Sequence, residues 1–311
     1  MRLIEALALQ PVEVVAPASV AICNPSIVPF GTGWEAVVRG VDPKPYRGPD
    51  QPYLSSENWL IRFDTDLHQT AAVQLDDSAL RAGHPEVQHG LEDGRLFVWQ
   101  GQRWILFSGL RRTEAGYLNT MALARLESDG LEGDRLAELT VLPSPRGLPR
   151  EKNWMPWVIG DALYFVYATD PLEAYALEGS TLRRVSGPDV FRPAKPFASG
   201  SSQVIPWGDA YLAVTHTRHL ASGGSRLWMK YVRKDPDYKR KKVNFLHQLV
   251  LFDAHFKVLK QSQPFSFEAD GIEFCAGIAA QDDRCVISYG LMDDRARLVE
   301  LTRAQVRGLL R

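Results

Sequence analysis

The chain contains few cysteines and no long apolar run, and these absences exclude several classes of protein. Cys23, Cys275 and Cys285 make no even disulfide framework and lack the paired spacing of a zinc site. We expect reduced, mostly buried thiols, as in a cytoplasmic protein. No apolar run approaches the roughly 18 residues of a membrane helix, and residues 6–9 are too short for the core of a signal peptide. The sequence therefore predicts no membrane span and a cytoplasmic location.

The chain also lacks an excess of charge of one sign and several familiar catalytic motifs. Its formal net charge is −1, and it has no recognisable nucleic-acid-reading module, so we expect no nucleic acid partner. It has no glycine-rich nucleotide loop, no His-Glu-x-x-His, no Gly-x-Ser-x-Gly and no Cys-x-x-Cys. We therefore expect no cofactor and no obligatory metal. The adjacent acids Asp293 and Asp294 are interpreted as solvent-facing hairpin residues.

The strongest local charge feature is the basic stretch from Lys230 to Lys242. It is interpreted either as a solvated hairpin or as an arm that binds an anionic donor or an acidic glycan.

Helical periodicity is almost absent, and a unit of two apolar strands repeats five times instead. In each unit a polar residue opens the first strand, and a Gly- or Asp-rich turn leads to the second strand, as hairpins require. The opening residues recur at intervals of about 50 to 70 residues, which is typical of a propeller. They are Asn24, Asp93, Asn153, Ser202 and Glu273.

The sequence thus predicts an all-β chain, a single five-bladed β-propeller over residues 1–311 whose first strand closes against the last unit. A short C-terminal helix is expected from Thr302 to Leu310. A β-sandwich is the alternative, and five similar units argue against it. Because a propeller gathers the starts of its inner strands around one axis, the five opening residues are expected to line one pocket. Their mixture of acids and amides, with bases nearby, favours a carbohydrate site.

Several motifs, in order along most of the chain, resemble the five-bladed propellers of the mannoside phosphorylase group, glycoside hydrolase family 130. Related β-mannosidases and β-mannosyltransferases belong to the same group. Glu92-Asp93-Gly94-Arg95 resembles its Glu-Asp-Pro-Arg signature, with glycine in place of proline. The other matching segments are Arg39, Lys152-Asn153-Trp154, Gly200-Ser201-Ser202, Val214-Thr215-His216 and Glu273-Phe274 through Tyr289-Gly290. Thr217 departs from the glycine that often follows the histidine.

The resemblance implies an enzyme that transfers glycosyl groups with inversion. It is expected to be a glycoside phosphorylase or a nucleotide-sugar-dependent glycosyltransferase, with mannose as one candidate sugar. The partners would be a sugar phosphate or nucleotide sugar and a glycan acceptor. The sequence leaves open whether the chain forms a homo-oligomer. The segment from Glu151 to Trp154 resembles a bacterial branch associated with glycan biosynthesis, which favours synthesis over degradation.

The candidate residues divide into three roles. Asp93 is the candidate proton carrier, acting directly or, as the resemblance implies, through a sugar hydroxyl. Glu273 is the second candidate catalytic carboxylate, which would activate water in a hydrolase or bind hydroxyls in a transferase. The phosphate- or donor-binding candidates are Arg39, Arg95, Lys152 and His216, since guanidinium and ammonium groups suit phosphate. The sugar-binding candidates are Asn24, Glu92, Asn153, Trp154, Ser202, Gln203 and Tyr289.

Each candidate also has a structural interpretation. Asp93 could cap a turn and pair with Arg95, the bases could form ion pairs at blade edges, and His216 and the aromatic residues could belong to the core. At the level of the whole chain, the alternatives to a glycosyl-transferring enzyme are a glycoside hydrolase and a non-catalytic glycan-binding propeller.

Overall fold

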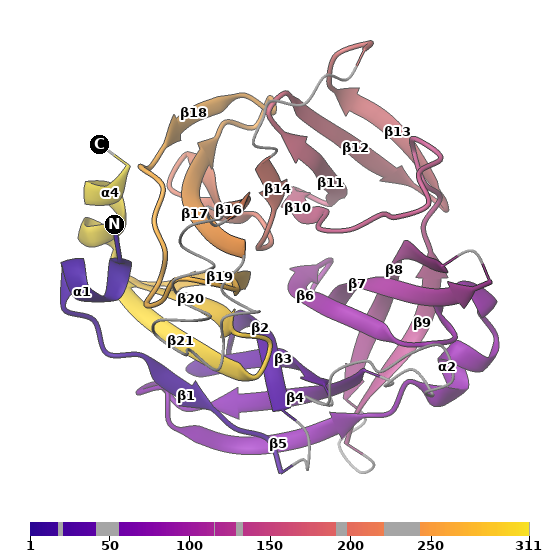
Figure 1. The fold of residues 1–311 in the computed structure, drawn as a ribbon, viewed down its shortest axis with the longest axis horizontal. Helices are drawn as coiled ribbons and strands as arrows, with labels where there is room; N and C mark the ends of the chain where they lie inside the picture. The colour runs from indigo at the N-terminus through magenta and orange to yellow at the C-terminus, as the bar shows by residue number, and fades with distance from the viewer. Residues whose placement is uncertain are drawn as a thin grey trace, which may run out of the picture.

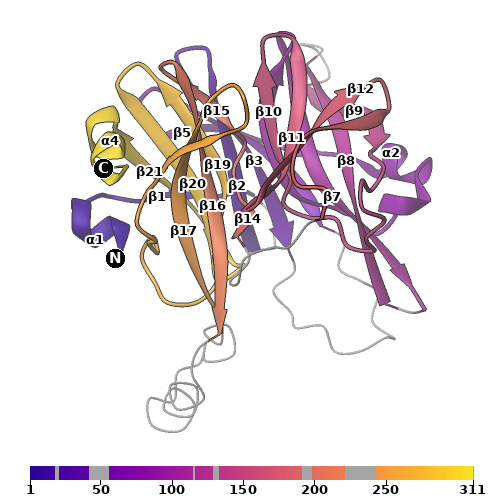
Figure 2. The same cartoon turned by 90° about the horizontal axis from the view of Figure 1, so that it is seen from above.

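The structure is a computed structural model that describes residues 1–17, 21–41, 56–114, 116–128, 133–190, 198–220 and 243–310. Five antiparallel sheets surround a central axis, which confirms the predicted five-bladed propeller (Figure 1). Turned by 90°, the sheets stand side by side in a single layer (Figure 2). The basic stretch from Lys230 to Lys242 lies outside the described residues.

The first three sheets each consist of four strands that follow one another in sequence from the axis outward. Sheet one contains β2 (Ala21–Phe30), β3 (Gly33–Val41), β4 (Glu57–Phe63) and β5 (Gln69–Leu75). Sheet two contains β6 (Leu91–Trp99), β7 (Gln102–Thr113), β8 (Gly116–Ser128) and β9 (Asp134–Val141). Sheet three contains β10 (Met155–Ile159), β11 (Ala162–Thr169), β12 (Leu172–Glu178) and β13 (Thr181–Ser186).

The fourth sheet has an interrupted inner strand. Both β14 (Ala198–Gly200) and β15 (Ile205–Trp207) pair with β16 (Ala210–Leu220), and β17 (Val243–Phe252) and β18 (Val258–Gln261) complete the sheet. Residues 201–204 form the break, so the predicted opening residue Ser202 lies between two short strands rather than at the start of one.

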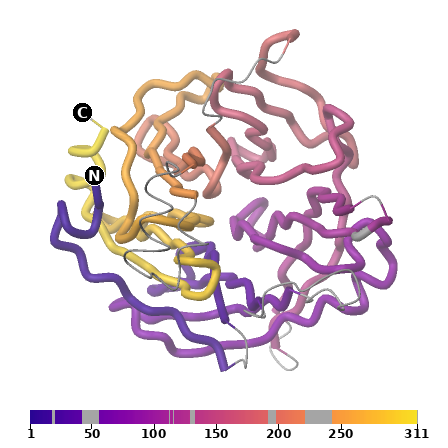
Figure 3. The backbone as a smooth tube through the Cα atoms, viewed as in Figure 1, coloured from indigo at the N-terminus to yellow at the C-terminus, as the bar shows by residue number. Residues whose placement is uncertain are grey.

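The fifth sheet joins the two ends of the chain. It contains β19 (Glu273–Gln281), β20 (Arg284–Leu291), β21 (Arg295–Thr302) and the N-terminal β1 (Val12–Val14). Strand β1 pairs antiparallel with β21, Val12 facing Leu298, which confirms the predicted closure (Figure 3). The ring is therefore held by backbone hydrogen bonds between the first and last strands.

Short helices fasten the ends of the chain and one connection between blades. Helix α1 (Leu3–Leu7) buries Leu3, whose N–H donates to the Ser266 carbonyl at 2.8 Å. Helix α4 (Arg303–Leu309) begins with a capping box formed by Thr302 and Gln305, as the sequence predicted. Helix α2 (Ser78–Ala82) and the 3₁₀ helix η1 (Pro85–Val87) connect sheets one and two. No helix in the described residues is long and apolar enough to cross a membrane.

The hydrophobic core consists of five clusters, each filling the space between two neighbouring sheets. Both faces of an inner strand are therefore covered, and β19 is buried over most of its length. Cys23, Cys275 and Cys285 are all buried and unpaired within these described strands. The inner strands are therefore continuous apolar runs in the sequence, because neither face of these strands is exposed to solvent.

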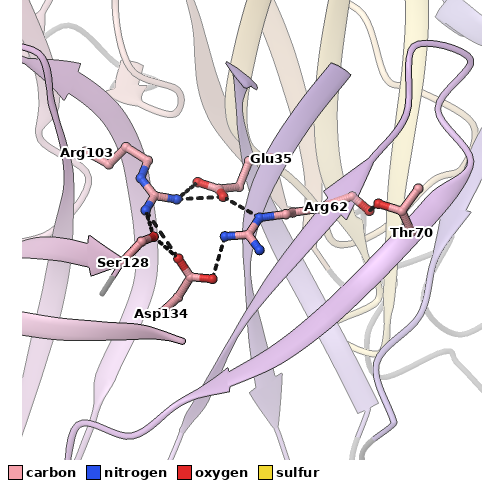
Figure 4. Close-up of polar contacts among 6 residues, drawn as sticks. All are labelled: Glu35, Arg62, Thr70, Arg103, Ser128 and Asp134. Carbon is pink, nitrogen blue, oxygen red and sulfur yellow. Dashed lines mark hydrogen bonds and ion pairs between the residues drawn. The ribbon is translucent and has the colours of Figure 1, made fainter. Parts of the chain in front are cut away.

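A buried ion-pair network adds a polar link between sheets one and two (Figure 4). Glu35 on β3 is fully buried and accepts hydrogen bonds from Arg103 Nη1 at 2.6 Å and from Arg62 Nε at 3.2 Å. Asp134 on β9 accepts from the same two guanidinium groups. Ser128 bonds to Arg103 and Asp134, and Thr70 Oγ1 donates to the Arg62 carbonyl at 3.2 Å.

Candidate active site

A cavity of about 490 Å³ opens at the end of the propeller axis where the inner strands begin. All five sheets or their connections contribute to its wall. The lining residues are Cys23, Asn24, Arg39, Val41, Asp93, Lys152, Asn153, His216, Arg218, Val243, Phe245, Ile272, Phe274 and Asp293. The structure thus brings together six of the candidate residues named from the sequence: Asn24, Arg39, Asp93, Lys152, Asn153 and His216.

Three of these residues share an unusual backbone conformation. Asn24, Asp93 and Asn153 have φ angles of 52°, 49° and 64°, in the left-handed region that asparagine and aspartate tolerate better than most residues. The register of β2 and β6 shifts at Asn24 and Asp93, as in a β-bulge. Because a bulge redirects a side chain, these Asn and Asp residues can face the axis from inside otherwise buried strands.

Asp93 is held as a carboxylate by its neighbours. Its Oδ1 accepts hydrogen bonds from Asn24 Nδ2 at 2.8 Å and from Arg39 Nη1 at 3.2 Å. Burial by itself raises the pKa of Asp93, but the charges of Arg39 and Lys152 and the bond from Asn24 outweigh burial and lower the pKa to about 2. At neutral pH the pocket therefore contains a charged carboxylate that can accept a proton.

Glu92 lies beneath the pocket and connects two of its cations. Arg39 Nη2 donates to Glu92 Oε1 at 2.5 Å, and Lys152 Nζ lies 3.4 Å from Glu92 Oε2. Arg39 also donates from Nε to Ser56 Oγ at 3.0 Å. Glu92 is buried and does not line the cavity, so the structure places it as a support for Arg39 and Lys152 rather than within the pocket.

Arg95, a donor-binding candidate, also lies behind the pocket. Its guanidinium is fully buried and donates to the Ser201 carbonyl at 2.9 Å, the Asp93 carbonyl at 2.7 Å and Asn153 Oδ1 at 3.0 Å. Burial lowers the pKa of Arg95 to about 10. The side chain fixes the backbone of Asp93 and the side chain of Asn153, and it is not exposed to a ligand.

His216 lines the pocket as a neutral ring. Its Nδ1 lies 2.8 Å from Ser201 Oγ, and the ring stacks on Phe245 and meets the edge of Phe274. Burial, and then the proximity of His247 and Arg95, lower the pKa of His216 well below its usual value. At neutral pH His216 can hydrogen bond to a ligand but contributes no positive charge.

Glu273 does not reach the pocket. It is fully buried, and its carboxylate accepts hydrogen bonds from the backbone N–H groups of Phe267 at 2.7 Å and of Glu268 and Ala269, both at 2.8 Å. Burial raises its pKa to about 7, although the three N–H donors act in the opposite direction. The structure thus gives this candidate catalytic residue a structural environment, in which it fastens the segment before β19.

Ser202 and Gln203 lie deeper along the axis than the pocket. Ser202 Oγ accepts from the Val214 N–H and donates to the Gln203 carbonyl, at 2.9 and 2.7 Å. Gln203 Nε2 donates to the carbonyls of Ile27 at 2.7 Å and Ile278 at 2.8 Å. Gln203 lines a second, apolar cavity of about 560 Å³ toward the other end of the axis. Both side chains bind backbone groups of the inner strands, where the sequence predicted contacts with sugar.

Trp154 and Tyr289 belong to the core between blades. Trp154 Nε1 donates to Glu151 Oε2 at 3.2 Å, and the ring packs on Phe165. Tyr289 stacks on Phe267 with ring centroids 4.1 Å apart and donates its hydroxyl to Glu268. Neither ring lines the pocket, so their alternative interpretation as core residues agrees with the structure.

The pocket contains residues that sequence reasoning missed. Arg218 follows His216 at the spacing of two that places side chains on one face of a strand. That spacing could have identified Arg218. Asp293, interpreted above as a solvent-facing acid, is exposed but also lines the pocket from the turn after β20. Phe245 and Phe274 flank His216 and supply the aromatic wall expected from Trp154 and Tyr289.

Among the described residues, no group of three or more His, Cys, Asp or Glu side chains is placed to hold a metal ion. The side chains that line the pocket include two carboxylates, three cations, two amides and a neutral imidazole.

The arrangement of the blades is shared with solved structures of mannoside phosphorylases and glycoside hydrolases. One represents glycoside hydrolase family 130, described as mannoside phosphorylases that include hydrolases of β-1,2-mannosidic linkages in Candida mannan. Its sequence is 15% identical to this one, and the two structures superpose with a TM-score of 0.63. The match covers 92% of this chain and 85% of that chain. The β-1,2-mannobiose phosphorylase from Listeria innocua, in complex with β-1,2-mannobiose, is 13% identical in sequence and superposes with a TM-score of 0.61. The match covers 97% of this chain and 96% of that chain.

MPT-4, a mannose phosphorylase from Leishmania mexicana in complex with a phosphate ion, is 9% identical with a TM-score of 0.59, over 93% of this chain and 86% of that chain. These comparisons confirm the resemblance predicted from the motifs at the level of the fold. By sequence, the chain matches no protein-family model and no curated protein.

Proposed function

We propose that the chain is a carbohydrate-active enzyme that transfers a glycosyl group, with inversion, to a hydroxyl acceptor in the axial pocket. The observation that carries this proposal is Asp93, a carboxylate held charged in the pocket by Arg39 and Asn24. The fold shared with the mannoside phosphorylases supports the class of reaction.

Asp93 is ionised at neutral pH, because its pKa lies at about 2. In the free enzyme it is therefore in the protonation state of a general base, which accepts a proton, rather than that of a general acid. In the proposed step the acceptor oxygen forms a bond to the anomeric carbon while the bond from that carbon to the donor phosphate oxygen breaks. The acceptor proton passes to Asp93, directly or through a sugar hydroxyl, and the single displacement inverts the anomeric centre.

The cations of the pocket match an anionic leaving group. Arg39, Lys152 and Arg218 all line the cavity, where they would offset the charge that develops on a departing phosphate or diphosphate. Because the Listeria and Leishmania relatives carry mannobiose and phosphate, we propose a mannosyl donor that is a sugar phosphate or a nucleotide sugar. We place the reaction in the cytoplasm.

The test is turnover by the wild-type chain and by Asp93→Asn with mannose 1-phosphate or GDP-mannose and a set of mannoside and glucoside acceptors. We expect Asp93→Asn to lower kcat by about 10²- to 10⁴-fold, the usual contribution of a positioned acid or base. Asp209→Asn, in an exposed turn between β15 and β16, is the control and should retain full activity. Equal rates for wild type and Asp93→Asn would reject the assignment.

A glycoside hydrolase is the second candidate, because a second carboxylate does line the pocket. That carboxylate is Asp293 and not Glu273. An inverting hydrolase uses a second carboxylate to activate water, so the same assay without phosphate or nucleotide would release free sugar, and Asp293→Asn would abolish the release. Glycan binding that is unchanged by Asp93→Asn, with no product under any condition, would instead indicate a binding propeller.

A further inference from the structure

A smaller cavity of about 180 Å³, which we call the side cavity, lies beside the axial pocket. It is formed by η1, by the β7–β8 hairpin and by the segment between β9 and β10. The residues of its wall that matter here are Glu86, Arg111, Leu118, Asn119, Leu148 and Glu151. This side cavity is not used by the step proposed for Asp93.

The side cavity and the axial pocket share one wall. Pro149 and Glu151 line the side cavity, whereas Lys152 and Asn153 line the axial pocket. Within sheet two, Leu91 on β6 pairs with Gly109 on β7, which pairs with Thr120 on β8, and Thr120 lines the side cavity. The two cavities therefore open at the same end of this sheet, and β8 lies two strand spacings, about 10 Å, outward from β6 (Figure 1).

The side cavity combines polar groups with exposed apolar side chains. Glu86 and Arg111 are exposed and Asn119 is buried at its wall, so both hydrogen-bond donors and acceptors are available. Leu118 and Leu148 are 37% and 49% exposed, which is unusual for leucine in this chain. The wall therefore offers polar side chains together with two exposed leucines, and a sugar ring has both a rim of hydroxyls and an apolar face.

The wall of the side cavity is also firmly held. Glu151 accepts hydrogen bonds from Ser144 and from Trp154 Nε1, the latter at 3.2 Å. The backbones of Asn119 and Glu151 are tied together, because Asn119 N–H donates to the Pro149 carbonyl and Glu151 N–H donates to the Asn119 carbonyl, both at 3.0 Å. Such a preformed wall lowers the entropy cost of binding a ligand.

From these contacts we propose that the side cavity is a subsite for a distal unit of an oligosaccharide acceptor whose end lies in the axial pocket. The acceptor is thus an oligosaccharide long enough to pass over the wall between residues 149 and 153, rather than a single sugar. This inference rests on the proposed glycosyl transfer and names the acceptor class for it.

The test measures binding on an array of purified manno-, gluco- and galacto-oligosaccharides of increasing length. Dissociation constants of the bound glycans are then determined by titration calorimetry. Wild type should bind glycans that reach the side cavity about tenfold more tightly than the shorter members of the same series. Leu148→Asp, which places a charge on the apolar wall, should remove this gain and leave the affinity for the short members unchanged.

Leu259→Asp is the matched control, because Leu259 is 46% exposed on β18, away from both cavities. It should keep the length preference. A wild type that binds short and long members equally, or a Leu148→Asp variant that keeps the preference, would overturn the subsite while leaving the proposed transfer intact. Failure to bind any glycan would overturn both proposals.

Discussion

Asp93 and Glu273 lie at or near the start of inner strands in two different blades, yet their surroundings differ. Asp93 lines the axial cavity, and its Oδ1 accepts hydrogen bonds from Asn24 and Arg39. The ion pair with Arg39 helps to keep the carboxylate charged. The oxygens of Glu273 are occupied by three backbone N–H groups inside the core. A carboxylate whose acceptor sites are filled by backbone donors contributes to stability rather than to chemistry.

Replacing Glu273 by Gln tests this assignment. The variant places an amide N–H₂ group where one of the backbone N–H groups requires an acceptor, so we expect the free energy of unfolding to fall by about 1–3 kcal/mol. Urea denaturation gives this value, and activity per folded molecule should be unchanged. A large loss of kcat at unchanged stability would restore Glu273 to the catalytic residues.

Between neighbouring sheets, packing and charge act together. Phe30 lies beneath both Arg62 and Arg103, whose guanidinium carbons are 5.1 and 5.3 Å from the centre of its ring. The same two arginines pair with the buried Glu35 (Figure 4). This network links sheet one to sheet two, the two sheets that also carry the Arg39–Asp93 ion pair.

We expect Arg103→Met to destabilise the protein by about 3 kcal/mol, because removal of one partner of a buried pair leaves the other insufficiently compensated. Arg125→Met in the same sheet is the control. Arg125 pairs with Glu127 and with the exposed Glu138, and solvent screens these pairs, so its loss should cost much less stability than the loss of Arg103. Both values come from urea unfolding curves, and similar losses in the two variants would show that the network contributes no more than a surface pair.

For the whole molecule, the decisive feature is the closure of the ring by β1. Three residues at the start of the chain pair with the last strand of the fifth sheet, and Val14 enters the core between sheets five and one. The pairing covers the outer edge of β21 and joins the two ends of the chain in one sheet. The axial pocket draws residues from all the blades, so we expect it to lose its shape if this junction opens.

Val14→Asp should open this junction, since it buries a charge without a partner, and we expect a loss of about 3 kcal/mol or more. Val15→Asp is the matched control: Val14 is 2% exposed and Val15 is 55% exposed, so the control should change stability by no more than about 0.5 kcal/mol. Hydrogen exchange should show faster exchange in β1 and β21 of Val14→Asp. Protection equal to wild type there would contradict the role of the closure.

Much of this architecture could be predicted from the sequence. The turns at Gly31, Gly101, Gly160, Gly208 and Asp282 separate inner from second strands where expected. The Thr302 cap was also predicted, because caps, turns and apolar runs are local signals. Closure of the ring was predicted as well, but the strand that makes it, Val12–Val14, was not located in the sequence. Outer strands such as β5 and β13 were missed, since their residues are mostly polar and half-buried and carry little periodicity.

The sequence by itself determined the five blades and their turns, since each depends on residues adjacent in the chain. Only the tertiary structure decided which polar side chains reach the axis. A bulge turns Asn24 and Asp93 into the cavity, whereas Glu273 and Gln203 satisfy backbone groups of neighbouring strands. The charge of the pocket also depends on the tertiary structure, because burial keeps His216 neutral while ion pairing keeps Asp93 ionised.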